Sequence, residues 1–190
     1  AVRGPRQLLF DLIECPEKVK RALKQVETAV AEVYQAQAAE LDSAAVGTLN
    51  RFGMYCSGML DVPQCDFSCM ISREMFNEFQ LPAQRAELEN LDHSIYHLDG
   101  PGAVQHLEAL CSLERLDMIQ WQPGAGNYDE DWSDLYQRID DLGKGQFRWL
   151  GGAAGMQTIR ECWRQLKSRK QYFKLGGISR AELDGFLESF

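Results

Sequence analysis

Four short apolar segments, each followed by a glycine, recur through the second half of the chain. The segments with their glycines span residues 94–100, 118–124, 147–152 and 172–177, and the first glycines are Gly100, Gly124, Gly151 and Gly176. Successive units are therefore 24, 27 and 25 residues apart, which is the length of one strand, one loop and one helix. Strands that alternate with helices at this spacing pair in parallel through right-handed crossovers, so the pattern predicts an α/β fold.

Amphipathic helices are predicted in the intervals between these strands. Residues 131–143 and 156–166 each carry apolar side chains on one helical face. The last helix is predicted to begin at Ser179, which has capping-box spacing to Glu182.

Two further helices are predicted upstream. Pro16 fits a first helical turn, and apolar residues follow at alternating steps of four and three positions through a long helix that ends near Leu41. Ser72 is predicted to cap a helix through Phe79, which Pro82 must kink or interrupt.

A fifth strand is predicted in residues 50–58, "NRFGMYCSG", followed by a loop from Gly58 to Cys69. A closed eight-stranded (β/α)8 barrel takes about 250 residues, so five strands in 190 residues are too few to close one. We therefore expect a single domain over residues 1–190 that forms the carboxy-terminal portion of a TIM-type barrel, as a partial barrel of about five βα units. A smaller open sheet is the alternative. In either case the five strands should be parallel neighbours, with Gly58 and the other four glycines on one edge.

Composition limits the class of protein and its partners. With 190 residues, of which 45% are hydrophobic, the chain can bury a sizeable core. Its 28 acidic and 20 basic residues, with a formal net charge of -8, argue against nonspecific binding to nucleic acid or to an anionic membrane. No apolar run approaches the roughly 18 residues that span a bilayer, and the first residues lack the arrangement of a signal peptide.

The six cysteines contain no CxxC pair, which fits reduced thiols, with Cys65 and Cys69 as the expected exceptions. Together these features predict a cytoplasmic protein without a membrane partner.

Polar side chains stand at the ends of the predicted strands. His97 and Asp99 are two positions apart and so share one face of a strand, and Gln120 and Gln122 repeat this spacing. Tyr55 ends the first predicted strand. Because active sites of parallel barrels lie at the carboxyl ends of the strands, we expect His97, Asp99, Gln120 and Tyr55 to open into one concavity.

A histidine and an aspartate with this spacing suit two kinds of chemistry. They can be two ligands of one metal ion, or the carboxylate can orient the imidazole for proton transfer. Asp99 as a cap of the following turn and His97 as a hydrogen-bonded core residue are the alternative. A catalytic zinc usually keeps three protein ligands, so a third donor would come from Cys65, Asp66 or Cys69.

The segment from Cys65 to Gly126, which begins "CDFSC" and contains "SIYHLDGPG" and "MIQWQPGAG", resembles the carboxy-terminal half of the uroporphyrinogen decarboxylase-like family. This family also holds corrinoid and cobalamin-type methyltransferases. Residues 3–23, "RGPRQLLFDLIECPEKVKRAL", are similar to the family helix that precedes a mid-barrel strand. The resemblance implies a TIM-type barrel in which the strand end "HLDG" faces the substrate pocket.

In the methyltransferase branch, a histidine, a cysteine two residues on and a second cysteine from a late strand hold a zinc ion that activates a thiol. His97 matches the histidine, but Asp99 takes the place of the first cysteine. The end of the last strand, Leu175 to Gly177, offers no thiol. An aspartate makes a harder site than a thiolate does.

The resemblance and the strand ends together assign ten roles to eight residues. His97, Asp99 and Tyr55 are expected to be catalytic; Gln120, Gln122, Asp66 and Ser68 are expected to bind substrate; His97, Asp99 and Cys65 are the candidate metal ligands. The expected cofactors are zinc and a corrinoid that donates or accepts a methyl group, with none for a decarboxylase. The expected partners are a small-molecule or tetrapyrrole substrate, a corrinoid protein, and a second chain or an amino-terminal half that completes the barrel.

Three functions are compatible with this sequence. The first is methyl transfer of the corrinoid/thiol type. The second is decarboxylation of a tetrapyrrole or another carboxylate, with His97 as the proton donor. The third is a non-catalytic barrel fragment that binds a partner chain.

Overall fold

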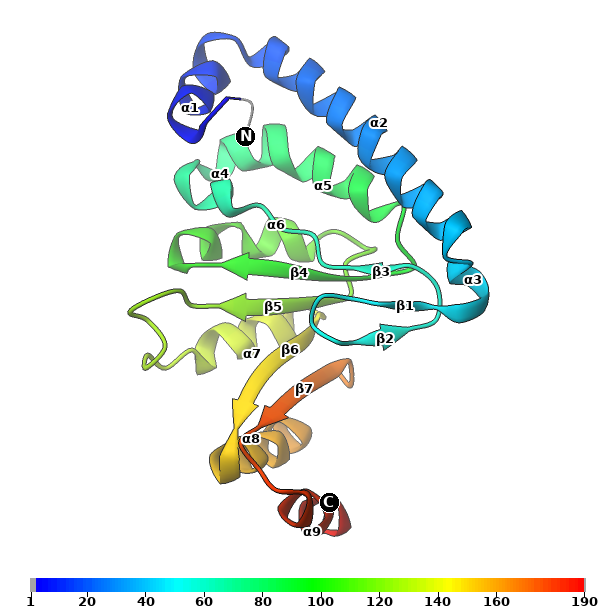
Figure 1. Ribbon diagram of the computed structural model, residues 1–190. Coiled ribbons are helices and arrows are strands. Elements are labelled where there is room, and N and C mark those ends of the chain that lie inside the picture. Colours follow the sequence, from blue (N-terminus) through cyan, green and yellow to red (C-terminus); the bar gives the residue numbers. More distant parts are fainter. Residues whose placement is uncertain (1–2, 190) are drawn as a thin grey trace.

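The computed structural model describes residues 3–189, and its centre is a parallel sheet of five strands. In spatial order these are β3 (Leu60–Asp61), β4 (His93–Asp99), β5 (Met118–Gln122), β6 (Gly145–Gly151) and β7 (Gln171–Gly176). Every neighbouring pair is parallel. The sheet curls into half of a barrel with helices along its outer side (Figure 1). The prediction of an α/β fold is therefore confirmed, and four of the five predicted strands, β4 to β7, are parallel neighbours.

The helices lie mainly on the convex side of the sheet (Figure 1). They are α1 (Pro5–Glu14), α2 (Pro16–Glu40), α3 (Ser43–Val46), α4 (Arg73–Met75), α5 (Leu81–Leu88), α6 (Leu107–Cys111), α7 (Ser133–Asp141), α8 (Gly152–Gln165) and α9 (Arg180–Glu188). Short 3-10 helices cover Asp66–Met70 and Pro101–His106. Within residues 3–189, no helix combines the length and the apolar character needed to cross a membrane.

Two hydrophobic clusters occupy the two faces of the sheet. The larger one lies between the strands and the helices and includes Tyr96, Leu98 and Trp121. The smaller one lies on the concave face and consists of Leu60, Val62, Ile95, Met118 and Phe147. Alternate residues of a strand point to opposite faces, so this division also determines which polar side chains face the concavity.

The predicted strand over residues 50–58 is wrong. These residues belong to an antiparallel hairpin of β1 (Thr48–Leu49) and β2 (Tyr55–Cys56). The Asn50 side chain accepts hydrogen bonds from the backbone N–H groups of Phe52 and Met54 at 3.0 and 3.1 Å, and Gly53 has a φ of 79°. This turn reverses the chain in the middle of the apolar run.

The first parallel strand is instead β3, inside the segment predicted to be a loop. Gly58 therefore precedes a strand and lies at the amino edge of the sheet, where a Cβ atom would come within 2.9 Å of the Asp92 side-chain Cγ. The expectation that Gly58 shares an edge with the other four glycines is wrong for this reason. Those four, Gly100, Gly124, Gly151 and Gly176, do end or follow the last four strands.

The predicted helices are present, with one local difference around Pro82. The Ser72 hydroxyl accepts from the Met75 N–H at 3.2 Å, and α4 continues into a π-helical turn over Phe76–Gln80 and then into α5. Pro82 lacks an N–H group, and the change of hydrogen-bond pattern comes immediately before it, so the helix continues past the proline. The capping box of the last helix is present, with Ser179 and Glu182 bonded to each other's backbone N–H groups.

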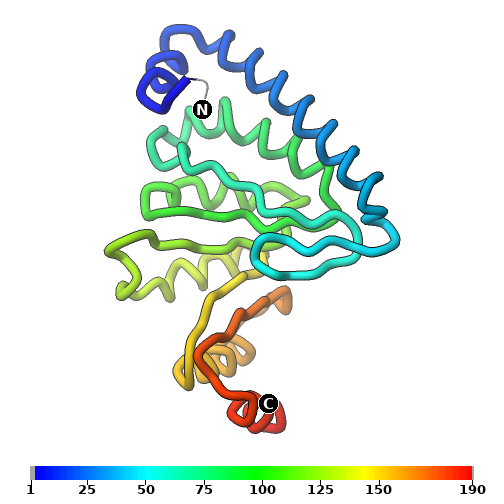
Figure 2. Tube along the Cα trace, viewed as in Figure 1, coloured from blue at the N-terminus to red at the C-terminus, as the bar shows by residue number. Residues whose placement is uncertain are grey.

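The hairpin of β1 and β2 lies across the concave face of the half-barrel (Figure 2). Its Phe52 ring packs 4.8 Å from the Phe147 ring, measured between centroids. The outer strands β3 and β7 each have one partner strand in the sheet. The concave face is thus partly covered by the chain's own hairpin, while within residues 3–189 no further strand pairs with either outer edge of the sheet.

Candidate functional site

The concave face carries its side chains in layers that follow the register of the strands. His97 pairs with Gln120, Gln120 with Phe147, and Phe147 with Tyr172. One layer nearer the carboxyl ends, Asp99 pairs with Gln122, and Trp149 pairs with Lys174. The predicted pairs at the ends of β4 and β5 therefore share one face at the carboxyl end of the sheet.

The centre of this group is a contact between His97 and Gln120. The Nδ1 atom of His97 bonds with Oε1 of Gln120, whose side chain is 1% exposed. Gln120 uses its Nε2 group to donate to the Trp121 carbonyl at 2.8 Å, so its oxygen is the atom that faces the imidazole. An amide oxygen only accepts, so Nδ1 of His97 is the donor of this bond, and in the neutral imidazole Nε2 carries the lone pair.

The chain after β3 brings Asp66 to the same side. Gln64 forms a parallel bridge with His97, and the His97 N–H donates to the Pro63 carbonyl at 2.9 Å. Paired residues of neighbouring strands point the same way, and the Gln64 amide donates to the Asp66 carboxylate at 3.1 and 3.3 Å. Asp66 is exposed and connected through Gln64 to the strand that carries His97.

Cys65 lies between Gln64 and Asp66 and points to the other face. Burial, and then the nearby Cys65 thiol, raise the pKa of the Tyr96 phenol, and alternation places Tyr96 on the face opposite His97. Burial raises the pKa of Cys65 to about 11, so the thiol is protonated at neutral pH. Among residues 3–189, no three side chains of His, Cys, Asp or Glu form a group that could hold a metal ion, and His97, Asp99 and Cys65 do not meet. All six cysteines are free thiols.

Two other predicted residues lie apart from His97. Tyr55 is 64% exposed on the hairpin, where its hydroxyl donates to the Val46 carbonyl at 3.1 Å. Ser68 is buried, and its carbonyl accepts from Nε2 of His106 at 2.9 Å, so this residue belongs to the packing of two 3-10 helices. Tyr55 lies in β2 of the hairpin and not at the end of a parallel strand, as was predicted.

Gln122 contacts a residue that the sequence did not single out. Its Nε2 group donates to the Tyr128 hydroxyl at 2.6 Å, which ties the end of β5 to the long loop that follows. Tyr128 is 63% exposed. The loop is therefore held beside the site.

The hairpin supplies further groups that sequence analysis missed. The Phe52 ring lies 6.3 Å from the His97 ring and 6.1 Å from the Trp149 ring. The Lys174 ammonium donates to the Phe52 carbonyl at 3.1 Å and lies 4.4 Å from the centre of the Trp149 ring. Trp149 and Lys174 each stand two residues before a predicted glycine break. Gln122 has the same offset and His97 a similar one, so this position relative to the glycine could have identified Trp149 and Lys174 from the sequence.

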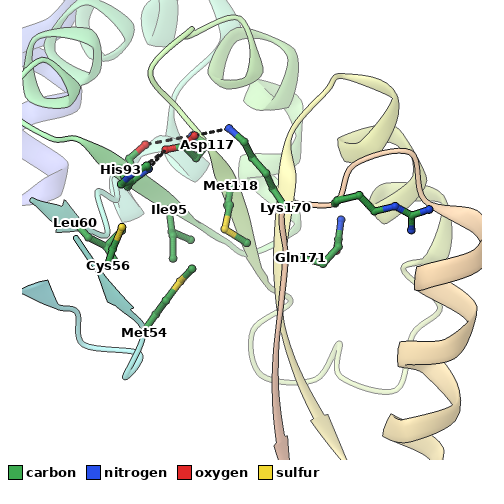
Figure 3. A pocket seen from close by; sticks show the side chains of 11 residues that line it. Met54, Cys56, Leu60, His93, Ile95, Asp117, Met118, Lys170 and Gln171 are labelled. Carbon is green, nitrogen blue, oxygen red and sulfur yellow. Dashed lines mark hydrogen bonds and ion pairs between the residues drawn. The ribbon is translucent and has the colours of Figure 1, made fainter. Parts of the chain in front are cut away.

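A separate cavity of about 280 Å³ lies at the opposite end of the sheet, between the hairpin and the amino ends of the strands (Figure 3). Its apolar wall includes Met54, Ile95 and Met118, and its rim includes Asp117. Burial would raise the pKa of Asp117, but the Lys170 ammonium at 2.7 Å holds it below its usual value. In barrels this end serves stability and the carboxyl end holds the chemistry, so we place the candidate site at His97.

No known family model matches the chain, and no curated protein or solved structure is significantly similar to it.

Proposed function

We propose that this chain is the carboxy-terminal portion of a uroporphyrinogen decarboxylase-like TIM-type barrel enzyme, and that its reaction is methyl transfer of the corrinoid/thiol type. Two features support this proposal. The curled parallel sheet has two open edges at which further strands could pair, and the residues of the "HLDG" motif stand at its carboxyl end. An amino-terminal half or a second chain would complete the barrel.

The observation that carries the proposal is the bond between His97 Nδ1 and Gln120 Oε1. In the neutral imidazole, this bond selects the tautomer whose Nε2 carries the lone pair. A thiol must lose its proton before it can accept a methyl group, and His97 Nε2 is placed to take that proton. The methyl group would come from a corrinoid on a partner protein, as a substrate of this enzyme.

A zinc ion does not fit the residues present. The expected thiolate ligand, Cys65, does not meet His97 and Asp99, Asp99 stands in the place of the family's first cysteine, and the end of the last strand offers no second one. No step of the proposed reaction is therefore routed through a metal. Asp99 and Asp66 remain on the substrate side, where they could bind polar parts of the acceptor.

Decarboxylation of a tetrapyrrole or another carboxylate is the second candidate. Asp99 favours it, because the methyltransferase branch has a zinc-binding cysteine at this position. After protonation, His97 could donate a proton from Nε2 to the carbon that loses CO2, while Gln120 keeps the ring in place.

The two reactions are distinguished by direct assays on the protein together with the segment that completes its barrel. Methyl transfer is followed by the absorbance change of methylcobalamin in the presence of a thiol, and decarboxylation by the release of CO2 from uroporphyrinogen. We expect His97→Gln to lower the methyl-transfer rate by about 100-fold or more and Gln120→Leu by about 10-fold, because each removes part of the base.

Tyr55→Phe is the matched control, and its rate should equal that of the unaltered protein. A chelator should leave the rate unchanged. A His97→Gln variant with the full rate would refute the role of His97, and CO2 release without methyl transfer would select the second candidate. If neither reaction occurs, the third function, a non-catalytic fragment that binds a partner chain, takes their place.

A further inference from the structure

Two cations flank Phe52 at the carboxyl side of the concave face. The guanidinium of Arg51 lies 5.3 Å from the centre of the Phe52 ring and donates to the Gln64 side-chain oxygen. The ammonium of Lys174 bonds to the Phe52 carbonyl and lies over the Trp149 ring. The hairpin turn thus places next to Phe52 two positive charges that are 123 positions apart in sequence.

Neither cation is neutralised by the part of the chain that the structure describes. Many other basic residues form ion pairs, but Arg51 and Lys174 form none within residues 3–189. Their hydrogen bonds go to neutral oxygens, which hold the side chains in place and leave their charge available. This is notable in a chain with a net charge of -8, because anions are repelled from most of its surface.

The acidic group connected to this pair is Asp66. Its carboxylate accepts two hydrogen bonds from Gln64, and Gln64 in turn accepts from Arg51. Gln64 therefore stands between Arg51 and Asp66, so the two charges are linked without being an ion pair. Arg51 keeps donors free for a ligand, since a guanidinium has five N–H groups.

We propose that Arg51 and Lys174 form a subsite for an anionic group, a carboxylate, sulfonate or phosphate, on a ligand whose other end lies at His97. A guanidinium and an ammonium bind such groups through charge-assisted hydrogen bonds. The Phe52 and Trp149 rings beside them exclude part of the water. Phe52 connects this subsite to the proposed base, because its ring lies 6.3 Å from the His97 ring.

The part of this inference that concerns the reacting end rests on the proposed function, while anion binding by Arg51 and Lys174 does not. The test is therefore a binding experiment with unreactive probes. Ethanesulfonate, acetate and inorganic phosphate are titrated separately into the isotopically labelled protein at constant ionic strength, and the amide shifts of residues 51–53 and 174 are followed by NMR. At least one probe should give saturable shifts confined to these positions, and the strongest binder among the three identifies the anion class.

Arg51→Gln and Lys174→Gln should each weaken the binding of that probe by about 3- to 10-fold, and Lys174→Arg should largely restore it, because an exposed cation contributes a modest charge-assisted bond. Arg164→Gln is the matched control, since Arg164 is an exposed cation on α8 without an ion pair in the described chain. All of these side chains are exposed, and retained dispersion of the amide spectrum verifies that the variants are folded.

The absence of saturable shifts with all three probes would overturn the proposal. Equal weakening by Arg164→Gln would also overturn it, because the attraction would then be nonspecific. His97→Gln should bind the probe normally, because His97 is not part of the anion subsite. If the unaltered protein binds the probe but catalyses neither methyl transfer nor decarboxylation, the anion subsite stands and only the proposed function is removed.

Discussion

Gly145 is the first residue of β6, and its replacement by alanine tests how closely the strands that position the site are packed. Its φ is not positive, so an alanine meets no backbone strain. A Cβ atom here would lie 2.6 Å from the Lys170 Cβ and 2.9 Å from the Met118 Cγ, and closer still to the Lys170 carbonyl oxygen. Ordinary contacts between carbon atoms are about 3.5 to 4.0 Å, so β6 must move by about 1 Å to accept the methyl group.

That movement acts on two backbone hydrogen bonds. The Gly145 N–H donates to Asp117 and the Gln146 N–H donates to Lys170, both at 2.9 Å. Overpacking costs about 1 to 3 kcal/mol, and each weakened bond costs about 1 kcal/mol. We therefore expect Gly145→Ala to lower the free energy of unfolding by about 2 to 5 kcal/mol, and the Tm by about 4 to 20 °C for a chain of this length.

The assay is urea unfolding followed by circular dichroism, with the m-value unchanged if the transition stays two-state. Gly151→Ala at the other end of β6 is the matched control. Its Cβ would meet only the Gly176 carbonyl oxygen, at 4.0 Å, so its stability should stay within about 0.5 kcal/mol or rise slightly. If Gly145→Ala were as stable as Gly151→Ala, the close packing of β6 on β7 would be refuted.

Three further predictions follow from local contacts. Ser179→Ala removes the cap of α9 and should cost about 1 kcal/mol, seen as faster amide exchange in that helix; unchanged exchange would contradict the capping box. Burial, and then the charge of Asp61, raise the pKa of Glu87. The contribution of this carboxyl to stability is therefore fully present below its unfolded pKa and is lost as the pH rises through its folded pKa. Glu87→Gln should therefore gain stability relative to the unaltered protein between pH 4 and pH 7 in urea unfolding, and a constant difference would count against it. Iodoacetamide at pH 8 should alkylate the exposed Cys69 at least about tenfold faster than Cys65, as read by mass spectrometry, and equal rates would show that Cys65 is accessible.

The last four strands were predictable because each combines an apolar run with a glycine break at a regular interval. The first was not, because β3 has two residues and no periodic pattern. Its Asp61 accepts a hydrogen bond from the Tyr34 hydroxyl of α2 at 2.6 Å, a tertiary contact that no local pattern reveals. The run that includes Tyr55 was misread because the reversal depends on side-chain bonds of Asn50.

The candidate site was predictable where it depends on the register of long strands. His97 and Gln120 face each other because β4 and β5 pair over five residues. The orientation of Cys65 was not predictable, since it depends on one isolated bridge between Gln64 and His97. A shift of one residue there would turn the thiol toward the histidine.

The bond between Lys174 and the Phe52 carbonyl can form only late in the synthesis of the chain. The two residues are 122 positions apart, and a ribosome adds about 5 to 20 residues per second. Phe52 therefore leaves the ribosome about 6 to 24 seconds before its lysine partner. During that time the hairpin turn lacks its anchor, and the apolar ring of Phe52 waits for Phe147 and Trp149, which are also made later.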